Sequence, residues 1–181
     1  DLVAAISQKL IEMNLAIIQH FLAFEQVKII WGSDDMGFRS GTLISPRDLR
    51  EFVLPHHKKM ADLSHAAGRL YLLHSCGNLT EIMPDLIEDV GIDAKHSFED
   101  TIESVVDAKR KYGQRIAVLG GIDVDFLCRS DEAAVRQRVR ETLQACQPGG
   151  GYCLGTGNSV ANYIPLENYL AMLDEGRRYS A

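Results

Sequence analysis

Five short apolar runs alternate with helical stretches along this chain, and that alternation restricts the fold more than any other feature. The runs predict strands that begin near residues 27, 69, 92, 115 and 151. Strands separated by helices pair in parallel through right-handed crossovers. No run is followed by a Gly-x-Gly-x-x-Gly turn, so a doubly wound sheet is only the alternative. The sequence predicts an α/β fold of the (β/α)8 barrel type, in which residues 1–181 form one domain with about the last five βα units.

Helical periodicity and capping residues predict the helices between these strands. Apolar residues from Leu2 to Phe24 recur at steps of three and four, as on an amphipathic helix. The stretch 46–67, which follows the cap residue Ser45, predicts a helix that bends at Pro55. The remaining predicted helices begin at Asn78, at a capping box from Asp100 to Glu103, at Ser130 and at Pro165.

The composition is that of an ordinary globular domain. Of the 181 residues, 46% are hydrophobic, the formal net charge is -6 and the pI is about 5.5. The negative charge argues against a nucleic-acid or anionic-membrane partner, and we see neither a membrane span nor a signal peptide. The four cysteines are scattered, which favours reduced thiols or a metal site over a disulfide framework. We therefore predict a cytoplasmic protein.

The stretch 69–78 carries the clearest chemical signal in the chain. Residues 70–73 are apolar and predict a buried strand that runs into His74 and Cys76. Side chains two residues apart point to the same side of an extended backbone, so this pair can bind one metal ion. A buried thiol and a histidine bonded to a backbone carbonyl are the alternative. Zinc needs more ligands, and Cys153 is a candidate third ligand, although a cysteine in an apolar run usually packs in the core.

Polar side chains also follow the first and third predicted strands, at the end where barrels place their active sites. Asp34 and Asp35 could supply a carboxylate ligand or a general acid/base, or they could cap the turn. We assign Asp35 to catalysis and Asp34 to the binding of substrate or cofactor. His96 is assigned to catalysis, as a group that orients a substrate carboxylate, with capping of its own loop as the alternative.

The last two strands are followed by segments that contain glycine. Gly121 lets a ligand approach the backbone closely, so we expect it to bind substrate or cofactor and the nearby Asp123 to act in catalysis. Asn158, in the last of these loops, is expected to bind substrate or cofactor as well. His56 and His57, within a predicted helix, are expected at the surface.

A set of motifs spread over almost the whole chain resembles one known family. The motifs are Asp34-Asp35, Ser40 to Pro46 with Phe52 and Pro55, His74 to Gly77, Gly91-Ile92-Asp93, Gly120 to Asp123, and Gly155 to Asn158 leading to Pro165-Leu166-Glu167. In order and spacing they resemble the uroporphyrinogen decarboxylase superfamily, which includes that decarboxylase and the cobalamin-dependent methyltransferases related to methylcobalamin:coenzyme M methyltransferase. The resemblance implies a (β/α)8 barrel, of which this chain covers the second half.

The resemblance implies two competing activities. In the methyltransferases a His-x-Cys pair like His74 and Cys76, with a later cysteine, binds zinc, and a methyl group passes from methylcobalamin to a zinc-activated thiol. Cys153 is the candidate for the later cysteine, although the family's position, counted back from Pro165, falls nearer Asn158. The decarboxylase of porphyrin biosynthesis uses no metal. The His-x-Cys pair favours the methyltransferase, with zinc and cobalamin as the expected cofactors.

A protein without catalytic activity is the alternative from another functional class. A partial barrel has open strand edges, so it could bind a tetrapyrrole or a partner subunit without turning a substrate over. The expected partners are a tetrapyrrole or a corrinoid protein and a small thiol acceptor. We also expect a homodimer or association with another barrel fragment.

Overall fold

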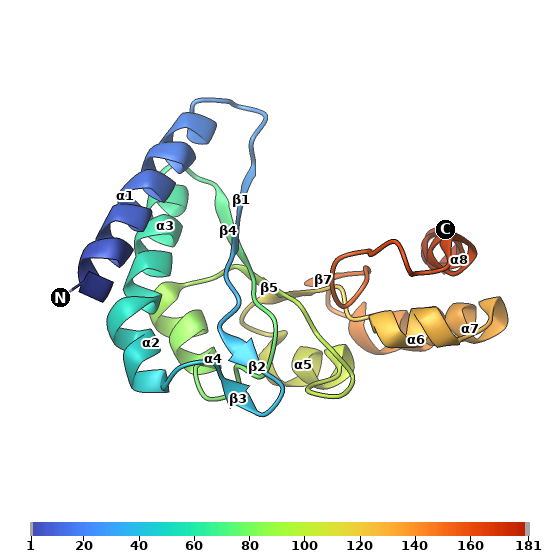
Figure 1. The fold of residues 1–181 in the computed structure, drawn as a ribbon. Coiled ribbons are helices and arrows are strands. Elements are labelled where there is room, and N and C mark those ends of the chain that lie inside the picture. Colours follow the sequence, from blue (N-terminus) through green and yellow to red (C-terminus); the bar gives the residue numbers. More distant parts are fainter. Residues whose placement is uncertain (1, 180–181) are drawn as a thin grey trace. The chain divides into compact units, whose positions relative to one another are not determined.

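The computed structural model describes residues 2–179 and contains two compact units, residues 1–94 and 95–181. We describe each unit by itself. The five predicted strands are present as β1, β4, β5, β6 and β7, and each is separated from the next along the chain by at least one helix (Figure 1). The alternation predicted from the sequence is therefore confirmed. The prediction of a single domain stays a prediction.

The first unit contains two parallel strands, a small hairpin and a layer of helices. Strand β1 pairs in parallel with β4, in a register that sets Ile29 against Leu70 and Ser33 against His74. Helix α3 lies beside both α1 and β4. The elements, in chain order, are α1 (Leu2–Leu22), β1 (Ile29–Ser33), β2 (Gly37–Phe38), β3 (Gly41–Thr42), α2 (Pro46–Phe52), α3 (Leu54–Ala66), β4 (Leu70–His74), α4 (Met83–Asp85) and the π-helical turn η1 (Leu86–Val90).

The second unit holds β6 in parallel with β7, and the pairing continues past the strand ends through a bridge between Ile122 and Thr156. Its core is built by α6, α7 and α8 around the fully buried Leu127, Val135 and Val139. The elements are β5 (Ala94–His96), which begins at the last residue of the first unit, α5 (Val105–Tyr112), β6 (Ala117–Leu119), α6 (Val124–Arg129), α7 (Glu132–Cys146), β7 (Tyr152–Cys153) and α8 (Leu166–Tyr179).

Several predicted helix starts are wrong, and each has a local reason. Asn78 does not cap a helix, because its side chain accepts a hydrogen bond from the amide of Thr80 in a turn, and the helix begins only at Met83. The proposed capping box at 100–103 is a turn, and Ser104 caps α5 instead. Short polar side chains cap turns and helices equally well, so the sequence places such starts only to within a turn.

The helices on either side of Pro55 and of Ser130 also differ from prediction. The stretch 46–67 is two helices that meet at Val53, rather than one helix bent at Pro55, although Ser45 is the cap residue as predicted. Asp131 rather than Ser130 caps α7. Helix α6 was not predicted at all; its short length leaves too little periodicity to read from sequence.

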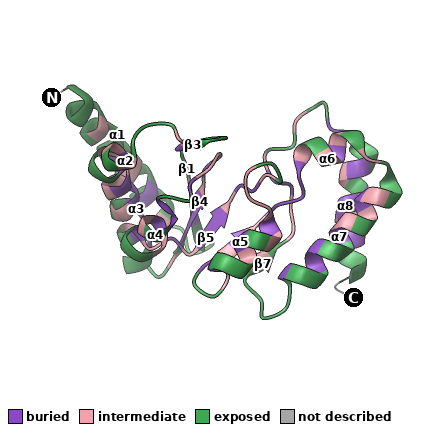
Figure 2. Ribbon diagram, turned by 90° about the horizontal axis from the view of Figure 1, so that it is seen from below, coloured by how far each residue is buried: buried purple, intermediate pink, exposed green. Residues whose placement is uncertain are grey.

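The face of α1 that packs against the rest of the unit is not the apolar stripe from which the helix was predicted. Ile11 and Ile18 are its buried residues and lie on the side toward α3. The regular apolar stripe on which the prediction was based is exposed, and most of α1 is green, the colour of exposed residues, in Figure 2. This exposed stripe consists of Leu2, Ile6, Leu10, Met13, Ile17 and Phe21, with Phe24 just beyond the helix.

Helix α1 is also long and apolar enough to cross a membrane by length and composition, which the sequence analysis did not anticipate. The same length and composition are found in core helices of soluble proteins and in signal sequences near an N-terminus. Its middle carries an ion pair of 3.1 Å between Lys9 and Glu12. Charges at that depth oppose insertion into a bilayer.

We predict that the two faces of α1 contribute differently to stability. Replacing the buried Ile11 by Ala should lower the free energy of unfolding by about 2–4 kcal/mol, because it leaves a cavity against α3. Replacing Ile17, which is 45% exposed on the same helix, should cost less than about 1 kcal/mol. Urea denaturation of both variants measures the difference. Equal losses would mean that the exposed stripe is packed in solution.

Candidate metal centre

The pairing of β1 with β4 brings together the two segments that carry the predicted metal site. Because β1 and β4 are parallel, the segments that follow them leave the sheet at the same edge, with Ser33 opposite His74. The amide of Asp34 then donates a 3.0 Å hydrogen bond to the carbonyl of His74. The segment after β1, which carries Asp35, therefore lies beside the segment after β4, which carries Cys76.

Three ligand atoms converge at this edge. The sulfur of Cys76 lies 3.4 Å from Nε2 of His74, which lies 4.0 Å from Oδ1 of Asp35. The three atoms all lie within 4.8 Å of one another. Around a tetrahedral zinc ion, with bonds of about 2.3 Å to sulfur and about 2.0 Å to nitrogen, those two ligands lie about 3.5 Å apart. The distance between the sulfur and the nitrogen fits zinc, and so do the three donor types, a thiolate, an imidazole and a carboxylate.

Backbone contacts fix the Cys76 side of the cluster. The carboxylate of Asp35 accepts a 3.3 Å hydrogen bond from the amide of Cys76. The amide of Met36 donates to the buried hydroxyl of Ser75 at 3.1 Å. One carboxylate oxygen thus holds the Cys76 backbone and also faces His74, so the two segments are tied together before any ion binds.

Two glycines allow the β2–β3 hairpin to lie directly on the loop after β4. Gly77 has a φ of +83°, and a Cβ there would lie 2.1 Å from the carbonyl carbon of Gly37. A Cβ on Gly37 would in turn lie 2.7 Å from the carbonyl oxygen of Cys76. The amide of Asn78 donates a 2.8 Å hydrogen bond to the carbonyl of Phe38, which closes the contact. Only glycine fits at both positions, and the close approach packs the hairpin against the loop that carries Cys76.

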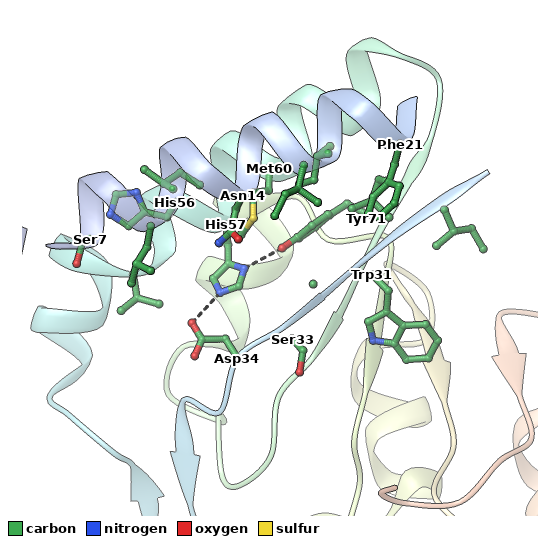
Figure 3. Close-up of a pocket in the computed structure, with 18 of the residues that line it drawn as sticks. Ser7, Asn14, Phe21, Trp31, Ser33, Asp34, His56, His57, Met60 and Tyr71 are labelled. Carbon is green, nitrogen blue, oxygen red and sulfur yellow. Dashed lines mark hydrogen bonds and ion pairs between the residues drawn. The ribbon is translucent and has the colours of Figure 1, made fainter. Parts of the chain in front are cut away.

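Asp34 faces away from this cluster and lines a cavity of about 640 Å³ in the first unit. There its Oδ2 lies 3.2 Å from Nε2 of His57, and Nδ1 of the same ring lies 2.9 Å from the hydroxyl of Tyr71 (Figure 3). Burial and the nearby Asp34 raise the pKa of Tyr71 well above its usual range. The structure places the carboxylate of Asp34 against His57 in this cavity, and the predicted role of Asp34 in binding substrate or cofactor stays a prediction.

His57 and Tyr71 are the polar residues that sequence reasoning missed. The prediction that His57 lies at the surface is wrong, since 3% of it is exposed. A signal was present, because His57 shares a helical stripe with the buried Leu54, Ala61 and Ser64. Tyr71 was read as an ordinary member of the apolar strand run.

The remaining predicted site residues lie in the second unit, and the contacts described for them are made within that unit. Nε2 of His96 lies 3.0 Å from the carbonyl oxygen of Thr156. A Cβ on Gly121 would lie 2.2 Å from Cβ of Val105, so this glycine is needed for close packing. Cys153 is exposed in β7. Catalysis by His96, ligand binding by Gly121 and metal binding by Cys153 stay predictions.

Asp123 and Asn158 line a second cavity, of about 890 Å³, within the second unit. Both carboxylate oxygens of Asp123 accept backbone hydrogen bonds, from Phe126 at 3.1 Å and from Asp100 at 3.0 Å. Asp123 therefore caps α6. Its predicted catalytic role and the predicted binding role of Asn158 stay predictions.

Comparisons with known proteins show which sequences resemble this chain. A family model described as uroporphyrinogen decarboxylase (URO-D) matches residues 1–179. The methylated-thiol–coenzyme M methyltransferase of Methanosarcina mazei is 35% identical over 133 residues, 73% of this chain and 33% of that protein. The chloroplastic uroporphyrinogen decarboxylase of Nicotiana tabacum is 29% identical over 177 residues, 91% of this chain and 43% of that protein.

A solved structure shares the fold. The structure of a methyltransferase from Methanosarcina mazei matches with a TM-score of 0.65 and 24% identity, over 85% of this chain and 43% of that one. With the family match, this confirms the predicted α/β barrel class. The chain spans less than half the length of these relatives.

We predict that the glycine contact is required for the structure of the cluster. Gly68→Ala is the control, because Gly68 has a φ of +68° with no atom within 4 Å of a new Cβ; it should cost about 1–2 kcal/mol, the strain of a left-handed residue. Gly77→Ala adds a backbone clash at a similar φ and should lower the free energy of unfolding clearly further. Chemical denaturation compares the two, and equal costs would mean that the hairpin does not press on this loop.

Proposed function

Because this chain belongs to the uroporphyrinogen decarboxylase family, we propose that it acts as a corrinoid-linked methyltransferase that moves a methyl group from methylcobalamin to a zinc-activated thiol. The observation that carries the proposal is the convergence of Asp35, His74 and Cys76. A relative named as a methyltransferase of methylated thiols and coenzyme M supports it. Metal-free decarboxylation would leave this set of zinc-type ligands without a use.

The chain's own residues hold the ion and leave room for the acceptor. His74 and Cys76 supply nitrogen and sulfur, and Asp35 supplies a carboxylate oxygen whose side chain is 65% exposed. Bound zinc would lower the pKa of a coordinated thiol, so that the thiolate is the nucleophile at neutral pH. Three protein ligands would leave one position of a four-coordinate zinc ion for the thiol acceptor. We further propose Cys153, the third ligand expected from the sequence, as the alternative to Asp35 among those three ligands.

The group transfer balances without a further reactant. Methylcobalamin would supply the methyl group to the thiolate: the new sulfur–carbon bond would replace the cobalt–carbon bond, whose electron pair would stay on cobalt. The thiol proton leaves to solvent before attack. We propose that His96 and Asp123 assist catalysis and that Asp34, Gly121 and Asn158 bind substrate or corrinoid, as predicted from the sequence.

Decarboxylation of uroporphyrinogen is the second candidate. Relatives named as uroporphyrinogen decarboxylases favour it, among them the tobacco protein, whose match covers 91% of this chain. The chain spans 33–43% of the relatives described above, so either activity is proposed for the protein that contains it. A cytoplasmic location, a corrinoid-protein or tetrapyrrole partner and a homodimer or fragment assembly belong to the same proposal.

Metal analysis with matched cysteine variants tests the proposed function. Purified chain equilibrated with zinc and then desalted should retain about one zinc per molecule, as expected for one site. Cys76→Ser should lose the metal, whereas Cys128→Ser, a change to a half-buried cysteine in α6, should retain it. Elemental analysis gives the stoichiometry, and the protein that retains zinc should methylate a small thiol from methylcobalamin.

The opposite results are equally clear. Equal zinc in wild type and Cys76→Ser would contradict the proposed site. Decarboxylation of uroporphyrinogen by metal-free protein, unchanged by Cys76→Ser, would favour the second candidate.

A further inference from the structure

Two hydrogen bonds link the buried residues Tyr71 and His57 to Asp34, one residue away from the proposed metal centre. The hydroxyl of Tyr71 lies 2.9 Å from Nδ1 of His57, and Nε2 of His57 lies 3.2 Å from the carboxylate of Asp34 (Figure 3). The three residues come from β4, α3 and the segment after β1. They link the helix layer to the edge of the sheet that carries the ligands.

The chemistry of the partners gives this chain of bonds a direction. A carboxylate only accepts hydrogen bonds, so Nε2 of His57 carries a hydrogen and donates it in the bond to Asp34. In the neutral ring Nδ1 then accepts from the hydroxyl of Tyr71. Tyr71 is fully buried and 3% of His57 is exposed, so water has little access to the bond between these two side chains. A broken contact here would leave a buried polar atom unpaired, which is costly. The side chain of Asp34 is 47% exposed, so this series of bonds reaches the surface at its carboxylate.

The sequence makes room for this contact at one position in particular. A Cβ on Gly32 would lie 2.2 Å from the hydroxyl oxygen of Tyr71. Glycine at that place in β1 lets the tyrosine extend past the strand to His57. The absence of a side chain at Gly32 thus leaves the space that the hydroxyl of Tyr71 needs to reach His57.

Asp34 is held on both sides, and it is covalently joined to a proposed ligand. Its amide donates to the carbonyl of His74 at 3.0 Å, while its carboxylate accepts from His57. Asp35, the next residue, presents its carboxylate to the opposite side, where Oδ1 lies 4.0 Å from Nε2 of His74. Since the Asp35 side chain is 65% exposed, packing does little to fix it, and the backbone at Asp34 sets its position.

We propose that His57 is a positioning residue, which fixes Asp34 from behind and so holds Asp35 at the distance from His74 and Cys76 that metal binding requires. The inference rests on the proposed function for its metal, but the positioning itself does not need one. Groups that orient metal ligands through hydrogen bonds typically change metal affinity 10–100-fold when removed.

Two substitutions of His57 separate the contact from the bulk of the ring. The amide nitrogen of Gln reaches about the position of Nε2 and can still donate to Asp34, whereas that of Asn reaches only the position of Nδ1. His57→Asn should therefore weaken zinc binding about tenfold, and His57→Gln should restore affinity to near the wild-type value. His65→Asn is the matched control, because it removes a 2.8 Å contact to Asp93 from the same helix and should leave affinity unchanged.

A second readout works without metal. Amide hydrogen exchange at Cys76, whose N–H donates to Asp35, should be about tenfold faster in His57→Asn than in His57→Gln or His65→Asn. The amide of Gly91, bonded to Leu86 in the same unit, reports global opening and should exchange alike in all three. If His57→Asn does not fold, Tyr71→Phe removes only the hydroxyl and should shift both readouts in the same direction.

The outcomes distinguish this inference from the proposed function. If His57→Asn, His57→Gln and His65→Asn all bind zinc with the affinity of the wild type, the positioning role is overturned and the proposed metal site is not. Failure of the wild type to bind zinc would overturn the proposed function. In that case, faster exchange at Cys76 in His57→Asn alone would support the positioning role, and equal exchange in all variants would overturn it.

Discussion

The parallel pairing of β1 with β4 is the interaction on which the candidate site depends. Its register sets Ser33 against His74, so the two chains leave the sheet together and carry Asp35 to Cys76. In an antiparallel pair the same residues would lie at opposite ends of the strands. Metal-ligand geometry here follows from strand direction first, and from side-chain choice second.

The hairpin and the helix layer then tighten what the strands bring together. Gly37 and Gly77 let the hairpin lie on the loop after β4 with no side chain between them. From the other side, His57 holds Asp34 through a hydrogen bond that is continued to Tyr71. The proposed ligands are thus held by two sets of contacts, one from the hairpin and one from the helix layer, as preorganised metal sites require.

Sequence patterns predict the alternation of elements well because strand runs and helix stripes are local. The two-residue spacing of His74 and Cys76 predicts that their side chains lie on one side of the backbone, and they lie 3.4 Å apart; metal binding by the pair stays a prediction. The contact of Asp35 with that pair depends on strand register, and the burial of His57 depends on which face of α3 packs; neither is local. Helix α1 gives the same lesson, since its most regular apolar stripe is its exposed one.

X-ray absorption at the zinc edge of the zinc-loaded protein tests the central claim most directly, because it reports the atoms bound to the ion. A site built from His74, Cys76 and Asp35 predicts at least one sulfur at about 2.3 Å together with nitrogen or oxygen at about 2.0–2.2 Å. A first shell of nitrogen and oxygen alone, with no sulfur, would contradict the account.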